Sequence, residues 1–387
     1  MNKLIPYGHF FIDNKDIAEV KNSLKNKFIT SGPYVHKLET QVAKKLKVSF
    51  CISCSSGTAA LHLAFMSLNL KKDDVIIMPI INFIASTNVL SLMNKKIFYA
   101  DVDKLTGQMT PQTVKECIKK NKLKKIKVIL TMYLGGSPDN ILDFYKLKKK
   151  YKCYIIEDAC HALGASYSDR KKINFIGSCA HSDICTFSFH PLKSITSGEG
   201  GLITTNNKTL SKKIKLLRSH GIIKKNHWDF NVKAPGLNYR LSDINCALAY
   251  SQFLKLNLFI KKRSQIAKKY NTYFKNFPNI FFIRKIERNV NSAWHLFLLK
   301  IRFENLNCDV ISLIKYLKKK KITVQQHYTP IYKFDYYKWI KKEDFPNAEK
   351  YYKNTISLPI FYKLENKSLI RVINAIKNFT TKKLSNN

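Results

Sequence analysis

A single lysine, Lys193, stands in a short connection between two strand-like runs. The first run, Ile184 to Phe189, ends just before a proline, and the second begins at Leu202 after a glycine-rich turn. An ammonium group on a flexible stem between two buried strands is partly dehydrated, so its amine can serve as a nucleophile in Schiff-base chemistry. The sequence therefore predicts that Lys193 attacks a carbonyl group, and that other residues hold a carbonyl-bearing cofactor over it.

An earlier apolar run, Tyr154 to Ile156, is followed by two acids, Glu157 and Asp158, and the carboxylate of Asp158 ends the predicted strand. A buried carboxylate is costly unless a cation or a donor pairs with it. If both runs share a sheet, Asp158 can pair with a protonated ring nitrogen of the molecule that Lys193 attacks. An N-cap role explains Asp158 in isolation, but less well beside Lys193. His161 follows, either as a donor to an oxygen of the same ring or as a core histidine.

A second candidate site lies where small residues open a helix after a strand. Gly57 permits a close approach, Thr58 supplies a hydroxyl, and the free backbone N–H groups from Gly57 to Ala59 form a seat for a phosphate. Small residues at a helix start are also common without any ligand. Phe83, at the exit of the next strand, is read as a core residue in preference to a ring stacked on a flat cofactor.

Further along the chain, Asn238 and Arg240 lie in a polar loop that runs into a helix. Both side chains have the reach to contact a ligand. Asparagine in a loop more often serves turn chemistry, and that interpretation is favoured for Asn238 from the sequence alone.

Strand-like and helix-like segments alternate over the first two thirds of the chain, which predicts an α/β fold with a mostly parallel sheet and ligands at the carboxyl ends of its strands. A chain of 387 residues is long enough for two domains. We expect a large cofactor-binding domain with an N-terminal arm over residues 1–252 and a smaller α+β domain over residues 253–387. The smaller domain is expected to contain a strand over residues 324–326.

The chain carries a formal net charge of +42. Such a charge first suggests a nucleic-acid-binding protein or one that binds acidic membranes. The lysines, however, are scattered over nearly every predicted helix, and arginine, which reads bases and phosphates in a bidentate manner, is scarce. The composition therefore favours lysine-coated solvated faces, with no nucleic-acid partner.

The nine cysteines are odd in number and several lie within apolar runs. This usage is typical of reduced core cysteines in a cytoplasmic protein. Cys51 and Cys54 have the spacing of a redox or metal pair, but no second such pair exists, so no metal site is expected. No signal peptide is recognised, and no apolar run has the ~20 residues that a membrane span needs.

Several motifs, taken together and in order, resemble the DegT/DnrJ/StrS family of pyridoxal-phosphate-dependent nucleotide-sugar aminotransferases. The motifs cover nearly the whole chain: Gly57 to Leu61, Glu157 to Ala159, Phe187 to Phe189 with Lys193, Glu199 to Gly201, and Asn238 to Arg240 with Asp243. The resemblance implies an aspartate-aminotransferase-like fold (fold type I). It also implies pyridoxal 5'-phosphate as the cofactor and L-glutamate as the amino donor.

By this resemblance Lys193 would hold the cofactor covalently, Asp158 would face its pyridine nitrogen, and Phe83 would stack on its ring. His161 would contact the ring hydroxyl, although many relatives have glutamine there. Asn238 would reach the phosphate from a second subunit, which implies a homodimer with shared active sites. Four residues would bind the phosphate from within the subunit: Gly57, Thr58, Ala59 and Ser188. The family's sugar-nucleotide contacts fall on six positions: Tyr7, Thr30, His190, Asn238, His327 and Tyr328.

Within the family, the segments around His190, Arg218 to Gly221 and Gln326 to Ile331 most resemble the aminotransferases of pseudaminic acid biosynthesis. The resemblance implies amination at C4 of a UDP-linked 4-keto-6-deoxy-N-acetylhexosamine. The transaminase that makes UDP-4-amino-4-deoxy-L-arabinose is the alternative within the family. A related dehydratase is disfavoured because Lys193 is retained, and an iron–sulfur relative is disfavoured because the cysteines are dispersed.

Overall fold

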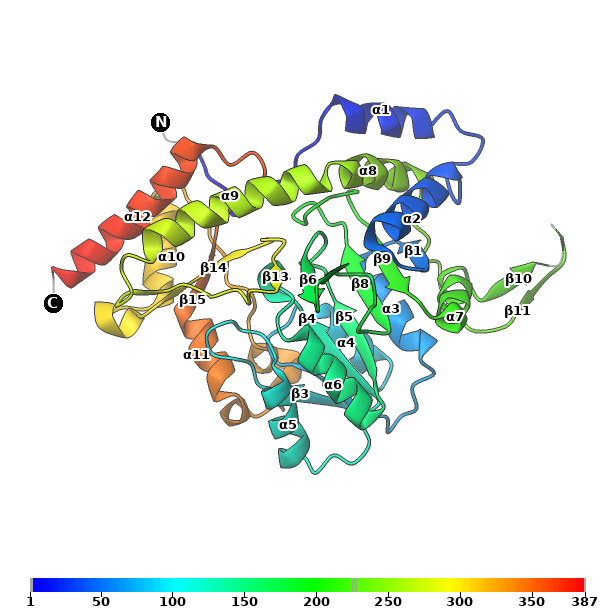
Figure 1. Cartoon of the computed structure of the whole chain (residues 1–387), viewed down its shortest axis with the longest axis horizontal. Coiled ribbons are helices and arrows are strands. Elements are labelled where there is room, and N and C mark those ends of the chain that lie inside the picture. The colour runs from blue at the N-terminus through cyan, green and yellow to red at the C-terminus, as the bar shows by residue number, and fades with distance from the viewer. Residues whose placement is uncertain (1–2, 225, 227, 386–387) are drawn as a thin grey trace.

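A seven-stranded sheet forms the centre of the molecule (Figure 1). The computed structural model describes residues 3–224, 226 and 228–385. From one edge to the other the strands are β1 (Phe50–Cys54), β9 (Gly201–Thr205), β8 (Ile184–Ser188), β5 (Tyr154–Asp158), β4 (Val128–Met132), β2 (Ile76–Pro79) and β3 (Ile97–Ala100). Neighbouring strands from β8 to β3 pair in parallel, and β9 runs antiparallel to both β8 and β1. The predicted α/β fold with a mostly parallel sheet is confirmed.

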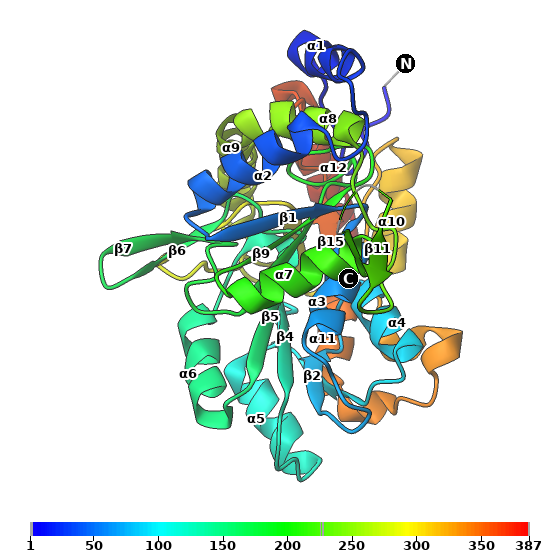
Figure 2. The same ribbon diagram turned by 90° about the vertical axis from the view of Figure 1, so that its right-hand side faces the viewer.

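The strands are apolar on both faces because helices cover both faces. In β5, Ile156 packs on one side of the sheet and Ile155 on the other. Figure 2 shows α2 and α8 on one side of the sheet and α3 and α7 on the opposite side. The helices of this part are α1 (Asn14–Ser23), α2 (Pro33–Leu46), α3 (Gly57–Ser67), α4 (Ala85–Leu92), α5 (Pro111–Lys120), α6 (Ile141–Tyr151), α7 (Lys208–Arg218) and α8 (Asp243–Leu254).

The C-terminal third forms its own core beside this sheet. There the long helix α9 (Leu256–Phe274) packs with α10 (Val310–Lys319) and α12 (Asn366–Leu384) around an antiparallel sheet. That sheet contains β12 (Phe281–Phe282), β14 (Phe297–Ile301) and β15 (Thr355–Leu358), and α11 (Pro346–Asn354) contacts β14. The strand expected over residues 324–326 is wrong, because only a single bridge from Gln325 to Ser357 forms there.

The two parts of the chain are interlocked. A third sheet joins β6 (Ser166–Asp169) and β7 (Lys172–Phe175) to β13 (Val290–Asn291) from the C-terminal third. The N-terminal arm crosses the other way, and Ile5 pairs with Ile322. The domain boundary between residues 252 and 253 stays a prediction. Short 3-10 helices complete the chain: η1 (Leu134–Gly136), η2 (Phe303–Leu306), η3 (Ile331–Lys333), η4 (Asp335–Tyr337) and η5 (Lys342–Asp344).

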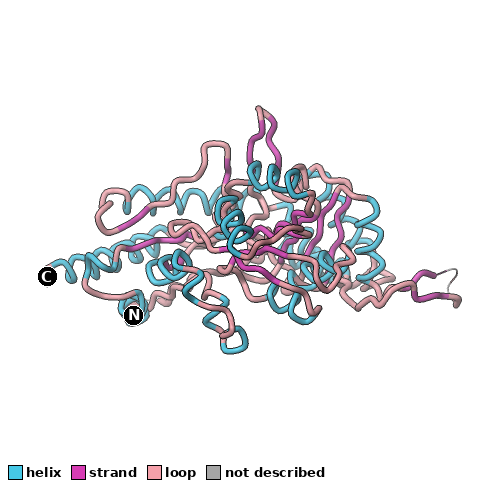
Figure 3. Tube along the Cα trace, turned by 90° about the horizontal axis from the view of Figure 1, so that it is seen from below, coloured by secondary structure: helices cyan, strands magenta, loops and turns pink. Residues whose placement is uncertain are grey.

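A two-stranded hairpin, β10 (Ile222–Lys224) and β11 (Phe230–Val232), projects from the body. Figure 3 shows it at the end of the molecule opposite to the C-terminus. Its apolar side chains Ile223, Phe230 and Val232 are exposed. Over the described residues, no helix has the length and apolar character needed to cross a membrane.

Candidate active site

Lys193 lies in the connection between β8 and β9, as predicted. Residues 189–200 join the two strands without a crossover helix, and β9 pairs with β8 in the antiparallel sense. Its turn is held from within, since the N–H of Lys193 donates to the carbonyl of His190 at 2.9 Å and the N–H of Ser197 donates to that of Phe189 at 3.0 Å. The half-buried Lys193 is therefore presented by a rigid loop at the end of the sheet.

Asp158 is the last residue of β5, the strand beside β8, and it is buried. Burial raises the pKa of its carboxyl group, while the backbone of Cys160 and the charge of Lys193 act in the opposite direction. Burial lowers the pKa of the Lys193 amine, and the charges of Cys160 and Asp158 oppose this shift. Lys193 and Asp158 are thus close enough to act on each other electrostatically, which fits a nucleophilic amine opposite a carboxylate.

The two neighbouring acids of β5 have different surroundings because successive strand residues face opposite sides of the sheet. Glu157 points into the core, where it accepts a hydrogen bond from the hydroxyl of Tyr133 at 2.8 Å. Asp158 accepts from the N–H of Cys160 at 3.2 Å. A turn follows Asp158, with no α-helix, so the alternative of an N-cap aspartate is wrong.

The first turn of α3 lies against the same end of the sheet. Ser56 caps the helix by accepting from the N–H of Ala59 at 3.0 Å. Of the residues described, none accepts a hydrogen bond from the N–H of Gly57 or Thr58. A Cβ atom on Gly57 would lie 2.8 Å from Cβ of Ser188 and 3.3 Å from Sγ of Cys160. The helix start, the end of β8 and the turn after Asp158 therefore meet at one point, with two free N–H groups for an anion.

Aromatic and imidazole side chains line the site beside these residues: Tyr7, Phe83, His161, His327 and Tyr328. The hydroxyl of Tyr328 lies 2.9 Å from Nε2 of His161, and its ring centroid is 5.6 Å from that of Phe83. His327 contacts the ring of Tyr7 at 5.7 Å between centroids. Phe83 is 53% exposed, so its interpretation as a core residue is wrong. Its ring lies at the rim of the site, where a flat cofactor can stack on it.

Three predicted site residues lie outside these contacts. Thr30 and Asn238 are exposed and are held by backbone pairing, Thr30 to Ser242 and Asn238 to Ser219. Near Thr30, Asp243 accepts from the N–H groups of Tyr34 and Val35 at 2.8 and 3.1 Å, so its role is to fix the start of α2. His190 is half-buried in the Lys193 loop, where its Nδ1 lies 3.4 Å from the backbone N of Leu192.

Two further residues, Cys160 and His295, line the site. The N–H of Cys160 donates to the carboxylate of Asp158, and the thiol of Cys160 lies close to Gly57. The sequence offers one local signal for this contact, because an aspartate side chain often accepts from the N–H two residues later in a turn. His295 is buried with its ring 4.2 Å from that of His161. Nothing local in the sequence indicates this contact, because His295 comes from the C-terminal third.

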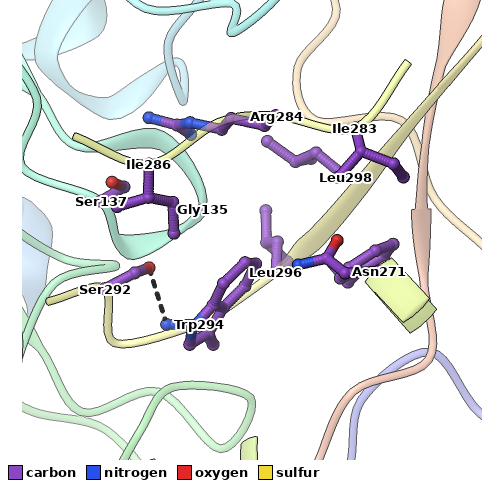
Figure 4. A pocket seen from close by; sticks show the side chains of 11 residues that line it. Gly135, Ser137, Asn271, Ile283, Arg284, Ile286, Ser292, Trp294, Leu296 and Leu298 are labelled. Carbon is purple, nitrogen blue, oxygen red and sulfur yellow. Dashed lines mark hydrogen bonds between the residues drawn. The ribbon is translucent and has the colours of Figure 1, made fainter. Parts of the chain in front are cut away.

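A small pocket near the site is separate from Lys193 and Asp158, neither of which lines it. Figure 4 shows Gly135 and Ser137 on one side of this pocket, Trp294 and Leu296 on another, and Leu298 beside Ile283. Its walls are mainly apolar. Across the described residues, no group of three or more histidine, cysteine, aspartate or glutamate side chains has a metal-binding arrangement.

The geometry fits pyridoxal phosphate. The free N–H groups at Gly57 and Thr58 suit its phosphate, Lys193 suits its aldehyde, and Asp158 suits its ring nitrogen. The tight contact of Gly57 with Ser188 leaves no space for a side chain at the phosphate seat. Lys193 and Asp158 stand at the carboxyl ends of neighbouring strands, where α/β sheets bind their ligands.

Comparisons with known proteins agree with this arrangement. The sequence model of the DegT/DnrJ/EryC1/StrS aminotransferase family matches residues 11–377. The chain is 36% identical, over 357 residues and 92% of each chain, to a Campylobacter jejuni protein named UDP-4-amino-4,6-dideoxy-N-acetyl-beta-L-altrosamine transaminase. It is 35% identical to an uncharacterized protein of Methanocaldococcus jannaschii, over 96% of each chain.

Among solved structures, the fold is similar to that of Helicobacter pylori PseC, described as an aminotransferase involved in the biosynthesis of pseudoaminic acid. The TM-score is 0.89 at 28% identity, covering 98% of this chain and 100% of the other. The PLP form of a putative sugar aminotransferase from Streptococcus pneumoniae shares the fold, with a TM-score of 0.87 at 24% identity and 99% and 100% coverage. The chain belongs to the DegT/DnrJ/EryC1/StrS aminotransferase family, and its cofactor is pyridoxal phosphate.

Proposed function

We propose that the protein transfers an amino group from L-glutamate to C4 of a UDP-linked 4-keto-6-deoxy-N-acetylhexosamine. The observation that carries this proposal is that Lys193 and Asp158 lie within electrostatic reach of each other at one end of the sheet, in a chain 36% identical to a transaminase named for that amino sugar. When bound, the cofactor supplies an electron sink that stabilises negative charge at the carbon losing a proton.

In this proposal Lys193 both anchors the cofactor and moves protons. Its amine, with a pKa lowered by burial, is more easily freed of its own proton than the amine of a surface lysine. With the cofactor and the amino donor bound, the free amine of Lys193 would take the α-proton of the donor and return a proton at the cofactor's reactive carbon. Asp158 keeps the ring nitrogen protonated, because a buried carboxylate favours a cation beside it.

The other predicted contacts place the substrates around this pair. The N–H groups of Gly57 and Thr58, with the hydroxyl of Ser188, bind the phosphate, and Phe83 stacks on the ring. The resemblance places His161 beside the ring hydroxyl, and in this structure its two ring nitrogens contact the N–H of Gly135 and the hydroxyl of Tyr328. Five residues form the proposed sugar-nucleotide side: Tyr7, Thr30, His190, His327 and Tyr328.

The proposed homodimer is supported by the exposure of Asn238 and by the exposed apolar hairpin that leaves the body nearby. Asn238 lies next to Leu237, whose carbonyl accepts from the N–H of His220, two residues before β10. A second subunit seated on this surface would bury Ile223 and Phe230 and bring Asn238 to the phosphate of its neighbour's cofactor.

The test is a substrate panel. Purified protein is incubated with pyridoxal phosphate, L-glutamate and a set of UDP- and dTDP-linked ketosugars, and products are read by mass spectrometry and NMR. We expect amination at C4 of the UDP-linked 4-keto-6-deoxy-N-acetylhexosamine and no product from the Lys193→Ala variant. Faster amination of the UDP-4-ketopentose would favour the aminoarabinose type, and turnover in the lysine variant would exclude the mechanism.

A further inference from the structure

The imidazole of His161 is held in one orientation by the main chain. The N–H of Gly135 points at Nδ1 of His161, with 3.4 Å between the two nitrogens. Gly135 has φ of +78°, and a Cβ on the next residue, Gly136, would lie 2.6 Å from the carbonyl oxygen of His161 and 3.1 Å from N of His295. The glycine pair therefore lets this loop pack closely against His161.

This contact fixes the direction of the next hydrogen bond. A backbone N–H can only donate, so Nδ1 of His161 must accept and carries no proton. Burial lowers the pKa of His161 well below its usual value, so the ring is neutral and its one proton is on Nε2. Nε2 then donates to the hydroxyl oxygen of Tyr328 at 2.9 Å.

Because the hydroxyl oxygen of Tyr328 accepts from His161, its own O–H proton remains available for a second hydrogen bond. Within the described part of the chain no residue accepts that proton. Burial and the charges of Asp158 and Cys160 raise the pKa of Tyr328, so the phenol stays protonated and faces the same region as Asp158. Tyr328 is half-buried, so an oxygen of a ligand that fills the site would give this hydroxyl the acceptor it lacks among the described residues.

We infer that Gly135 and His161 act as positioning residues that make Tyr328 an obligate hydrogen-bond donor to an oxygen of the bound ligand. The acceptor is a carbonyl or phenolate oxygen, carried either by the cofactor ring or by the keto sugar. Only the identity of this oxygen rests on the proposed function. The hydrogen bonds from Gly135 to His161 and from His161 to Tyr328 form within the protein and do not depend on the identity of the substrate.

The first test therefore needs no ligand or activity. In protein labelled with ¹⁵N-histidine, the ring nitrogens of His161 are assigned by their loss in His161→Gln, and long-range proton–nitrogen correlations identify the tautomer. We expect the neutral form with its proton on Nε2. A neutral form protonated on Nδ1, or a charged ring at neutral pH, would overturn the inference whatever the substrate proves to be.

The second test uses two variants of nearly equal shape. His161→Gln keeps an N–H that can donate to Tyr328, whereas His161→Glu offers only acceptor oxygens when ionised and draws the proton of Tyr328 toward itself. We expect His161→Glu to lower kcat/KM about tenfold relative to His161→Gln. Adding Tyr328→Phe should lower the kcat/KM of His161→Glu only slightly, and should lower that of His161→Gln about as much as it lowers that of the wild type.

Two readouts identify the acceptor. If it is a cofactor oxygen, Tyr328→Phe shifts the pH dependence of the visible absorption of the holoenzyme without sugar. If it is a sugar oxygen, that spectrum is unchanged and the loss appears only in the half-reaction with the ketosugar. Variants are compared only where circular dichroism and thermal unfolding match the wild type. If Tyr328→Phe changes neither readout, or if His161→Glu equals His161→Gln, the inference fails.

Discussion

The start of α3 offers the most stringent geometric prediction, because Gly57 has no room for even one carbon. In Gly57→Ala the added Cβ would lie 2.8 Å from Cβ of Ser188, 3.2 Å from its Oγ and 3.3 Å from Sγ of Cys160. Unstrained carbon contacts are ~3.5–4.0 Å, so the helix start and the end of β8 must separate by about 1 Å. Alanine favours the helix by about 1 kcal/mol, but overpacking costs about 1–3 kcal/mol.

The larger effect is expected on the cofactor. A shift of about 1 Å misaligns the N–H groups of Gly57 and Thr58, and hydrogen bonds to a charged group are worth about 1.5–3 kcal/mol each. Losing one of them weakens pyridoxal phosphate binding by about 10- to 100-fold. Absorbance titration with the cofactor measures this loss, and thermal unfolding of the apo protein measures the stability change of up to about 2 kcal/mol.

Gly8→Ala is the matched control. A Cβ there meets only Cδ2 of Leu192 at 3.4 Å, an ordinary contact, and Gly8 does not have a positive φ. The control should bind pyridoxal phosphate as the wild type does. If Gly57→Ala also binds with wild-type affinity, the helix start is not the phosphate seat.

Three further predictions concern charge and assembly. Burial lowers the pKa of Lys193, so the charged amine is less stable in the folded protein than in the unfolded chain. The apo Lys193→Met variant should therefore unfold at a higher temperature than the wild type near pH 7, and the difference should shrink as the pH approaches 10. Burial lowers the pKa of His327 to about 3, so this residue reduces the free energy of unfolding as the pH falls below about 6.5, by about 2 kcal/mol at pH 5. In urea unfolding measured against pH, the free energy of unfolding of His327→Gln should fall less steeply over this range than that of the wild type. Mixed Lys193→Ala and Asn238→Lys subunits should regain about a quarter of wild-type activity if sites are shared in a homodimer, and none if each subunit is self-sufficient.

The lysine loop and Asp158 were predictable because their signals are local. A strand, a proline and a glycine-rich turn place Lys193 between β8 and β9 without knowledge of the remaining chain. A carboxylate at the end of an apolar run marks Asp158, and the structure places it at the end of β5, the strand beside β8.

The errors arose where distant segments decide the outcome. The sequence predicts a core position for Phe83, because an aromatic residue at a strand exit gives the same pattern whether it packs inward or lines a rim; the structure leaves Phe83 53% exposed. The strand over residues 324–326 failed because only Gln325 finds a partner, in Ser357. The contacts of Gly135 and His295 with His161 depend on how separate loops meet.

The central claim is that Lys193 is the amine that holds the cofactor. The measurement is to add pyridoxal phosphate to purified protein, reduce with borohydride, digest, and locate the added mass by tandem mass spectrometry. The account predicts one stoichiometric adduct on the peptide that contains Lys193, and its absence in Lys193→Ala. Labelling scattered over surface lysines, with Lys193 unmodified, would contradict it.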